Sequence, residues 1–138
     1  MKDENAQRRK LLITVRLPVR WSDQDVNGHV NNAMHFTYFE QTRIEWLKNQ
    51  PAVTDARGQG VVVARASCDY IRPIPYPETL EIRMHAGPLG RSSFPTFYEM
   101  FGADGSTRYA EGHAVLVWVD RAAGKSQPLP DALRAVLE

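Results

Sequence analysis

The stretch WSDQDVNGHVNNAMHF, from Trp21 to Phe36, concentrates polar side chains directly ahead of an apolar helical segment. Asp23, Asp25 and His29 are residues whose side chains can accept a proton or attack a carbonyl carbon. A helix N-terminus beside them offers unpaired backbone N–H groups and a partial positive charge, which stabilise an oxyanion. A carboxylate next to such donors is sufficient to cleave a thioester, because a thiolate, whose conjugate thiol has a pKa of ~8.5, leaves readily.

The chain lacks the arrangements of residues that usually hydrolyse amides or alkyl esters, which are harder to cleave than thioesters. No convincing Ser–His–Asp or metal-binding arrangement is found, since His29 and His35 are six positions apart without H-E-x-x-H or C-x-x-C spacing. We therefore expect no metal and no bound redox cofactor. Cys68 lies in the alternating run VVVARASCDYI, which predicts a packed core thiol rather than a nucleophile.

The same polar residues also suit a purely structural role. Asp23 and Asp25 favour Asx-turns ahead of a helix, and Asn31 or Asn32 is a suitable N-cap. Gly28 permits a tight backbone path. The residues alone therefore leave both interpretations of Asp25 open, as a turn former and as a catalytic carboxylate.

Composition limits the class of protein. The chain has 138 residues, 43% hydrophobic and 24% charged, which fits one globular domain with a real core. A formal net charge of +1 argues against nucleic-acid binding. The one cysteine excludes internal disulfides and fits a reducing compartment. No apolar run approaches the roughly 20 residues of a membrane span, and no signal peptide is expected, so we predict a cytoplasmic protein.

Helical periodicity predicts a long helix over residues 33–47. Its apolar face is expected to contain Ala33, Phe36, Phe39, Ile44, Trp46 and Leu47. The opposite face is expected to contain Met34, Tyr38, Gln41, Thr42, Glu45 and Lys48. Glu40 and Arg43 fall within the apolar face at i, i+3 spacing, which predicts an ion pair inside the helix.

Alternating patterns predict five strands, and Pro18 in the first of them favours an edge strand or a bulge. The strands are expected at 11–21, 60–71, 80–87, 93–101 and 107–120, with a turn at 102–106 and a helix at 131–138. Residues 1–10 are expected to be a disordered tail, and residues 11–138 a single domain. One long apolar helix with several antiparallel strands predicts an α+β fold in which a curved sheet wraps around the helix.

The polar stretch belongs to a longer motif that resembles a known family. VRWSDQDVNGHVNNAMHFTYFEQTRIEWL, from Val19 to Leu47, resembles the signature of hotdog-fold thioesterases of the 4-hydroxybenzoyl-CoA thioesterase type. Its D-x-N-x-H-V-N-N portion also resembles plant acyl-carrier-protein thioesterases. The likeness continues in RPIPYPETLEIRMHAGPLGRSSFPTFYEM and AEGHAVLVWVD, and it covers nearly the whole chain from about Leu11. It implies a hotdog fold and hydrolysis of an acyl-CoA thioester to the free acid and coenzyme A.

The resemblance also implies roles for individual residues. Asp25 stands at the position of the nucleophile or general base, and Asn32 at the position whose backbone N–H receives the thioester oxygen. Bacterial relatives often have a histidine at the position of Asn32. Asn27 and His29 match catalytic positions of the plant enzymes, which use a further acidic residue in a second repeat that this chain lacks. Another hotdog subgroup carries its carboxylate on the helix, a role we do not expect for Glu40.

The segment GPLGRSSF predicts a contact with the coenzyme A phosphates, because family members hold the nucleotide with basic residues at this place. Arg91, Ser92 and Ser93 are the candidates, and Arg72 is the next basic residue to test. The alternative is a plain solvated turn. Coenzyme A would enter as part of the substrate. The resemblance and the exposed edge of a single sheet predict a homodimer or homotetramer with sites between subunits.

Two other functions stay open at the level of the sequence. A hotdog enoyl-CoA hydratase would show D-x-N-P-x-H, with aspartate and histidine five apart, whereas Asp25 and His29 are four apart and the proline is missing. A non-catalytic acyl-CoA sensor or binding module would normally bring a DNA-binding segment, for which the N-terminal tail is too short. The acyl group, and the choice between coenzyme A and an acyl-carrier protein, stay open.

Overall fold

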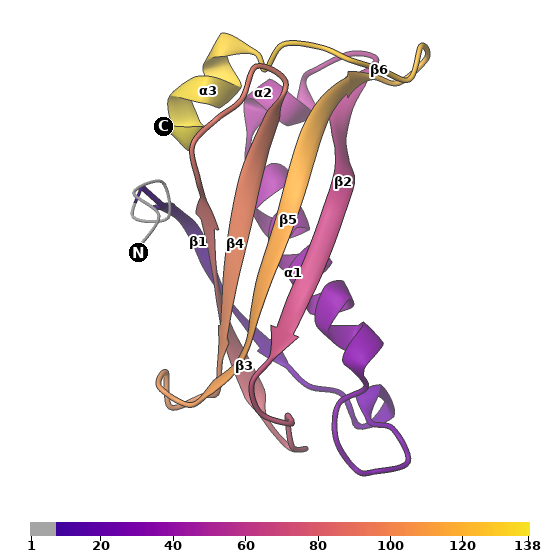
Figure 1. The fold of residues 1–138 in the computed structure, drawn as a ribbon, viewed down its shortest axis with the longest axis vertical. Helices are drawn as coiled ribbons and strands as arrows, with labels where there is room; N and C mark the ends of the chain where they lie inside the picture. The colour runs from indigo at the N-terminus through magenta and orange to yellow at the C-terminus, as the bar shows by residue number, and fades with distance from the viewer. Residues whose placement is uncertain (1–7) are drawn as a thin grey trace.

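The computed structural model describes residues 8–138, in which one antiparallel sheet packs against one long helix (Figure 1). The elements are β1 (Lys10–Pro18), the 3-10 turn η2 (Trp21–Asp23), α1 (Asn32–Leu47), α2 (Pro51–Thr54), β2 (Gln59–Tyr70), β3 (Thr79–Ala86), β4 (Ser93–Phe101), β5 (Arg108–Asp120), β6 (Lys125–Ser126) and α3 (Asp131–Leu137). The five predicted strands and two predicted helices are confirmed. The short elements η2, α2 and β6 were not predicted.

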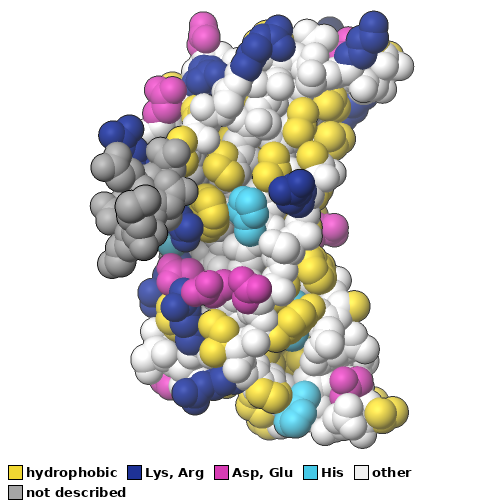
Figure 2. Space-filling model, in the orientation of Figure 1, with side chains coloured by type: hydrophobic (Ala, Val, Ile, Leu, Met, Phe, Trp, Pro, Cys, Tyr) yellow, Lys and Arg dark blue, Asp and Glu magenta, His cyan; other side chains and the backbone are white. Residues whose placement is uncertain are grey.

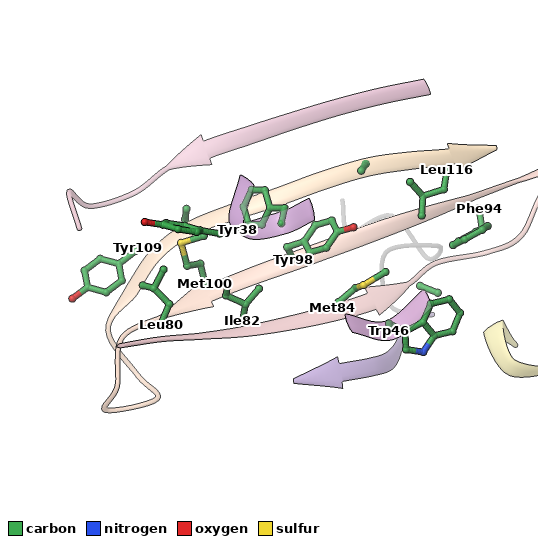
Figure 3. Close-up of a cluster of buried hydrophobic side chains, with 14 of the residues drawn as sticks. Tyr38, Trp46, Leu80, Ile82, Met84, Phe94, Tyr98, Met100, Tyr109 and Leu116 are labelled. Atoms are coloured by element: carbon green, nitrogen blue, oxygen red, sulfur yellow. The ribbon is translucent and has the colours of Figure 1, made fainter. Parts of the chain in front are cut away.

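The sheet has the strand order β1-β3-β4-β5-β2, with β6 added beside β5, and every pairing is antiparallel. Helix α1 lies against one face of this sheet, as Figure 1 shows. Strand β3 illustrates the pattern, because its alternate residues Leu80, Ile82 and Met84 are fully buried. The core side chains between sheet and helix include Tyr38, Trp46, Leu80, Ile82, Met84, Phe94, Tyr98, Met100, Tyr109 and Leu116 (Figure 3).

The buried face of α1 differs from the predicted one. It consists of His35, Tyr38, Phe39, Thr42, Arg43 and Trp46. Phe36 and Ile44, expected inside, are 38% and 45% exposed. Tyr38 and Thr42 are buried because their hydroxyl groups find acceptors, Tyr38 on Asp23 and Thr42 on the carbonyl of Tyr38, both at 2.8 Å. Internal hydrogen bonds therefore override the polarity that placed these two residues outside.

The predicted ion pair between Glu40 and Arg43 is wrong. Glu40 is exposed, whereas Arg43 is buried between helix and sheet, where its Nη1 donates to the Tyr98 hydroxyl at 3.3 Å. The guanidinium also lies 5.8 Å from the centre of the Tyr98 ring. Arg43 consequently belongs to a buried polar cluster with Tyr98 and Thr96, whose oxygens lie 2.8 Å apart.

Strands β1 and β2 form the two edges of the sheet. Pro18 ends β1, which is an edge strand, as the sequence predicted; the irregularity in this strand lies between Leu11 and Ile13, away from Pro18. The expected tail over 1–10 is too long, because Lys10 already pairs with Ala86; residues 1–7 lie outside the described part of the chain. Strand β2 is 12 residues long and pairs only with β5 within residues 8–138, so its outer edge is open.

The face of the sheet opposite α1 carries a mixture of apolar, charged and histidine side chains and is hollowed at its waist (Figure 2). At the centre of this face the rings of Phe97 and His113 stack with centroids 4.8 Å apart, and the Arg9 guanidinium lies 3.7 Å above Phe97. Partly exposed charged residues surround them. The sheet therefore has a dry face toward α1 and a half-solvated face away from it, which accounts for the strict alternation in its strands.

Gly112 of β5 lets α1 approach the sheet closely. A Cβ at this position would lie 2.6 Å from Cε2 of the Phe39 ring. That ring in turn packs on Tyr98, with centroids 4.9 Å apart. The absence of a side chain at Gly112 thus sets the depth of the helix over the centre of the sheet.

We expect Gly112→Ala to lower the free energy of unfolding by about 1–3 kcal/mol, because the added methyl group must displace the Phe39 ring from a close-packed core. Urea denaturation measures the loss. The double variant Gly112→Ala/Phe39→Leu should recover part of it, since the smaller side chain makes room. Unchanged stability in the single variant would contradict this account of the helix–sheet contact.

Candidate active site

The loop that joins β1 to α1, residues 19–31, is closed on itself by backbone hydrogen bonds and holds Asp25 at its turn. The N–H of Asp25 donates to the carbonyl of His29 at 2.8 Å, and the N–H of Gly28 donates to the carbonyl of Asp25 at 3.1 Å. Gly28 has φ +76°, a left-handed conformation that favours glycine. We call this segment the Asp25 loop.

The Asp25 carboxylate has acceptor capacity to spare. Its Oδ1 accepts the backbone N–H of Asn27 at 2.8 Å, which is the Asx-turn that the sequence suggested. No other hydrogen bond to this carboxylate is found among residues 8–138. An ionised carboxylate can accept about four hydrogen bonds. The turn therefore orients Asp25 without using up the group, and the structural and catalytic interpretations are compatible.

Asp23, two positions earlier, is buried and fully engaged. Its carboxylate accepts the Tyr38 hydroxyl at 2.8 Å, the Arg20 backbone N–H at 3.0 Å, and the Arg20 guanidinium at 2.8 and 3.0 Å. Burial favours the neutral acid, but these hydrogen bonds outweigh it and hold the pKa of Asp23 below its usual value. Asp23 thus fastens the Asp25 loop to α1.

Among the backbone N–H groups of residues 31–34, at the start of α1, one has no acceptor within residues 8–138. The N-cap Asn31 donates its own N–H to the Asp23 carbonyl, and its Oδ1 and carbonyl accept the N–H groups of Ala33 and Met34, all at 2.9 Å. The N–H of Asn32 has no acceptor among the described residues. Of these first-turn amides, only that of Asn32 is available to a ligand.

A cavity of about 290 Å³ lies beside this free donor. It is lined by Asp25, Asn27, His29, Val30, Asn32, His35, Tyr70, Ile71, Arg72 and Pro73. All four residues proposed from the resemblance as catalytic therefore lie around one cavity. The sequence interpretation missed His35 and Tyr70. His35 stands three positions after Asn32 in the same helix, a spacing that could have revealed it, whereas Tyr70 is brought in by the end of β2.

His35 and Tyr70 contact each other beneath the start of α1. The His35 ring is buried, and Nδ1 lies 3.3 Å from the Asn31 carbonyl, to which it must donate. Burial lowers the pKa of His35, so the ring is neutral and Nε2 is an acceptor. The Tyr70 ring meets it edge-on at 4.7 Å, and the Tyr70 hydroxyl donates to the Asn32 carbonyl at 2.9 Å.

The predicted phosphate-binding residues lie at the other end of the sheet. The Asp25 loop is bonded to the Thr79 end of β3, since Val19 donates to the carbonyl of Glu78. Arg91 follows the opposite end of that strand, which is about 23 Å long, and its carbonyl accepts the N–H of Leu129. Arg91, Ser92 and Ser93 are therefore remote from Asp25 of their own chain, whereas Arg72 lines the cavity.

Cys68 behaves as the sequence predicted for a packed thiol. It lies on β2 and packs partly against the core cluster. Burial raises the pKa of its thiol to about 11, so the group is protonated at neutral pH. No group of three or more His, Cys, Asp or Glu residues suited to a metal ion occurs in the part of the chain that the structure describes.

Known proteins are similar to this chain in architecture and in sequence. Residues 19–137 match the model of the thioesterase-like superfamily. The PA2801 protein of Pseudomonas aeruginosa has a TM-score of 0.87 and 36% identity, over 94% of this chain and all 100% of that one. A thioesterase from Thermus thermophilus, complexed with coenzyme A and Zn, has a TM-score of 0.80 and 34% identity over 92% of both chains. YsmA of Bacillus subtilis (strain 168) is 31% identical over 122 residues, 88% of this chain and 82% of that one.

The curved antiparallel sheet around one helix is the hotdog fold, as the sequence predicted. The chain belongs to the thioesterase-like superfamily. None of the helices within residues 8–138 is long and apolar enough to span a membrane.

The pKa of Asp23 generates a prediction for acid stability. Because this pKa is lowered by folding, the ionised carboxylate stabilises the native state above its unfolded value of ~3.9, and the contribution is lost as pH falls through the folded value. Asp23→Asn should therefore cost about 1–3 kcal/mol at pH 7, and the cost should shrink as the pH falls below ~3.9, because the wild type then progressively loses the same bonds.

Guanidinium denaturation of both proteins across this pH range measures the difference. Asp55→Asn, at an exposed carboxylate after α2, is the matched control and should change stability little. A loss in Asp23→Asn that is equally large at acid and neutral pH would contradict the assigned role of the charge.

Proposed function

We propose that this protein hydrolyses acyl-CoA thioesters, with Asp25 as the catalytic carboxylate and the Asn32 N–H as the oxyanion donor. The observation that carries the proposal is that a carboxylate with spare acceptor capacity and the one free amide of the first helical turn line the same cavity. Membership of the thioesterase-like superfamily supports the reaction class. The coenzyme A complex of the T. thermophilus relative supports coenzyme A as the thiol part of the substrate.

The proposed reaction begins with the thioester carbonyl oxygen at the Asn32 N–H, where the α1 dipole also favours negative charge. In one route, Asp25 takes a proton from water as the water oxygen bonds to the carbonyl carbon. The C–S bond then breaks and coenzyme A leaves as a thiolate, which takes up a proton. In the other route, Asp25 attacks the carbonyl carbon, expels the thiolate and forms an acyl anhydride that water hydrolyses. Both routes give the same products.

The remaining residues of the cavity have supporting roles in the proposal. Asn27 and His29 offer polar groups that can orient the thioester or the attacking water. His29 has neither the sequence spacing nor the proline of the hotdog hydratases, so we assign it no proton-transfer role toward an enoyl group. The cavity combines polar and apolar walls, so it suits more than one class of acyl group, and the panel of substrates below is chosen to tell these classes apart.

Asp25→Asn should abolish turnover while leaving binding intact, because an amide can neither accept the water proton nor attack the thioester. We expect kcat to fall by about 10²–10⁴-fold, the range that a positioned acid–base group contributes. Thiol release from a panel of aromatic, short-chain and long-chain acyl-CoAs measures activity. Calorimetry with a thioether analogue, which cannot be hydrolysed, measures binding.

Asp55→Asn is the matched control and should retain wild-type kcat. Full activity of Asp25→Asn would show that the carboxylate is misassigned. Hydration of enoyl-CoA by the wild type without thiol release would instead favour the hydratase, and analogue binding without any turnover would favour a binding module.

We propose further that the working unit is a dimer formed through the open edge of β2. Strand β2 runs from the Arg91 end of the sheet toward the Asp25 loop, so antiparallel pairing with a second β2 brings opposite ends of the two sheets together. Arg91 of one subunit would then lie at the same end as Asp25 of its partner. This arrangement allows Arg91, Ser92 and Ser93 to contact the coenzyme A phosphates across the interface, beside Arg72.

Complementation tests the shared site. Arg91→Ala alone should raise KM for acyl-CoA and leave a phosphate-free truncated thioester unaffected. Dimers mixed from Arg91→Ala and Asp25→Asn chains contain one site with both residues intact, and this site should show the wild-type KM at half of the wild-type kcat per dimer. A mixed dimer that retains the raised KM would mean that Arg91 does not act across the interface. A fully active monomer in sedimentation would overturn the dimer itself.

A further inference from the structure

The two peptide carbonyls that flank the Asn32 N–H are each held by a side chain. The Asn31 carbonyl belongs to the same peptide group as this N–H, and it accepts His35 Nδ1–H at 3.3 Å. The Asn32 carbonyl, on the next peptide group, accepts the Tyr70 hydroxyl at 2.9 Å. The free Asn32 N–H therefore belongs to one peptide group and adjoins the next, and each of these groups is fixed by a side chain that lines the same cavity.

The two side chains come from different elements and support each other. His35 belongs to the first turn of α1, and Tyr70 is the last residue of β2. Their rings meet edge-on, with centroids 4.7 Å apart and planes at 78°. Tyr70 thus ties the start of the helix to a strand that is distant in sequence, in addition to the Asp25 loop that precedes the helix.

The Tyr70 hydroxyl contributes little to folding. Tyr70 is 46% exposed, and its bond to Asn32 is at the surface. The start of α1 is already capped by Asn31 and fastened through Asp23. An exposed hydrogen bond that duplicates existing anchors adds little stability, but it restricts the direction of the amide that it flanks.

We propose that Tyr70 and His35 are positioning residues that aim the Asn32 N–H at the oxyanion. The inference rests on the proposed thioesterase function. Hydrogen bonds to the flanking carbonyls fix the two peptide planes, and the bond to Asn31 also polarises the N–H of its own peptide group. An oxyanion donor acts at the transition state, so its alignment affects kcat more than substrate affinity.

The test compares Tyr70→Phe with the wild type. We expect kcat to fall about tenfold with KM nearly unchanged, which is a part of the 10²–10³-fold effect of deleting a whole donor. A trifluoromethyl ketone analogue of acyl-CoA, which forms a tetrahedral oxyanion, should bind about tenfold more weakly. The thioether analogue has no such oxyanion and should bind as before. The melting temperature should stay the same.

Tyr76→Phe is the matched control, because Tyr76 is also exposed and its hydroxyl makes no hydrogen bond within the described residues. It should change none of these values. His35→Phe keeps a ring against Tyr70 but removes the Nδ1–H donor, and it should also lower kcat. The effects of Tyr70→Phe and His35→Phe should be less than additive in the double variant, because both act on one donor.

A second readout is independent of activity. The backbone order parameter of the Asn32 amide, measured by NMR, should fall in Tyr70→Phe and not in Tyr76→Phe. Unchanged order at Asn32 together with unchanged kcat would overturn the positioning role. A wild type that releases no thiol from any acyl-CoA would overturn the proposed function instead, and the Asn32 order parameter alone would then decide on the two side chains.

Discussion

The hydrogen bonds of Asp23 hold the Asp25 loop against the first turns of α1, and the rest of the candidate site depends on them. The carboxylate binds Tyr38 and Arg20, while the carbonyl receives the N–H of Asn31. With Asn31 fixed as the N-cap, its side chain and carbonyl occupy the next amides of the helix. The N–H of Asn32 is left over by this arrangement, so the capping of a buried helix leaves a first-turn amide free at the cavity.

The hotdog sheet explains why such a donor lies in a sheltered place. Five strands cover one side of α1, and Gly112 admits the Phe39 ring, so that the helix lies close over the centre of the sheet. The N-terminus of the helix then opens beside the end of β2, where Tyr70 and Arg72 line the cavity. Helix capping and strand length together bring the Asn32 N–H, the Asp25 carboxylate and the Arg72 side chain to one end of the sheet. The open edge of β2 beside them makes this end suited to a second subunit.

Much of this architecture is predictable from the sequence, because alternation and helical periodicity are strong in the strands and in α1. The cluster around Asp25 was also found, since a motif contiguous in sequence stays contiguous in space. The buried face of α1 was mistaken at Tyr38 and Thr42, whose hydroxyls are satisfied by partners that a helical wheel does not contain. The partner of Arg43 was mistaken for the same reason, because Tyr98 lies 55 positions away. Tyr70 joins the site through strand pairing, which no local pattern encodes.

The most direct measurement is a crystal structure with a trifluoromethyl ketone analogue of an acyl-CoA. We expect the oxygen that stands for the thioester carbonyl to lie about 2.7–3.1 Å from the Asn32 nitrogen, the distance of an oxyanion donor. The Asp25 carboxylate should lie on the adjacent carbon or on a water molecule aimed at it. An analogue whose corresponding oxygen lies far from Asn32, or which binds in the hollow on the opposite face of the sheet, would contradict the assignment of the Asn32 N–H as the oxyanion donor.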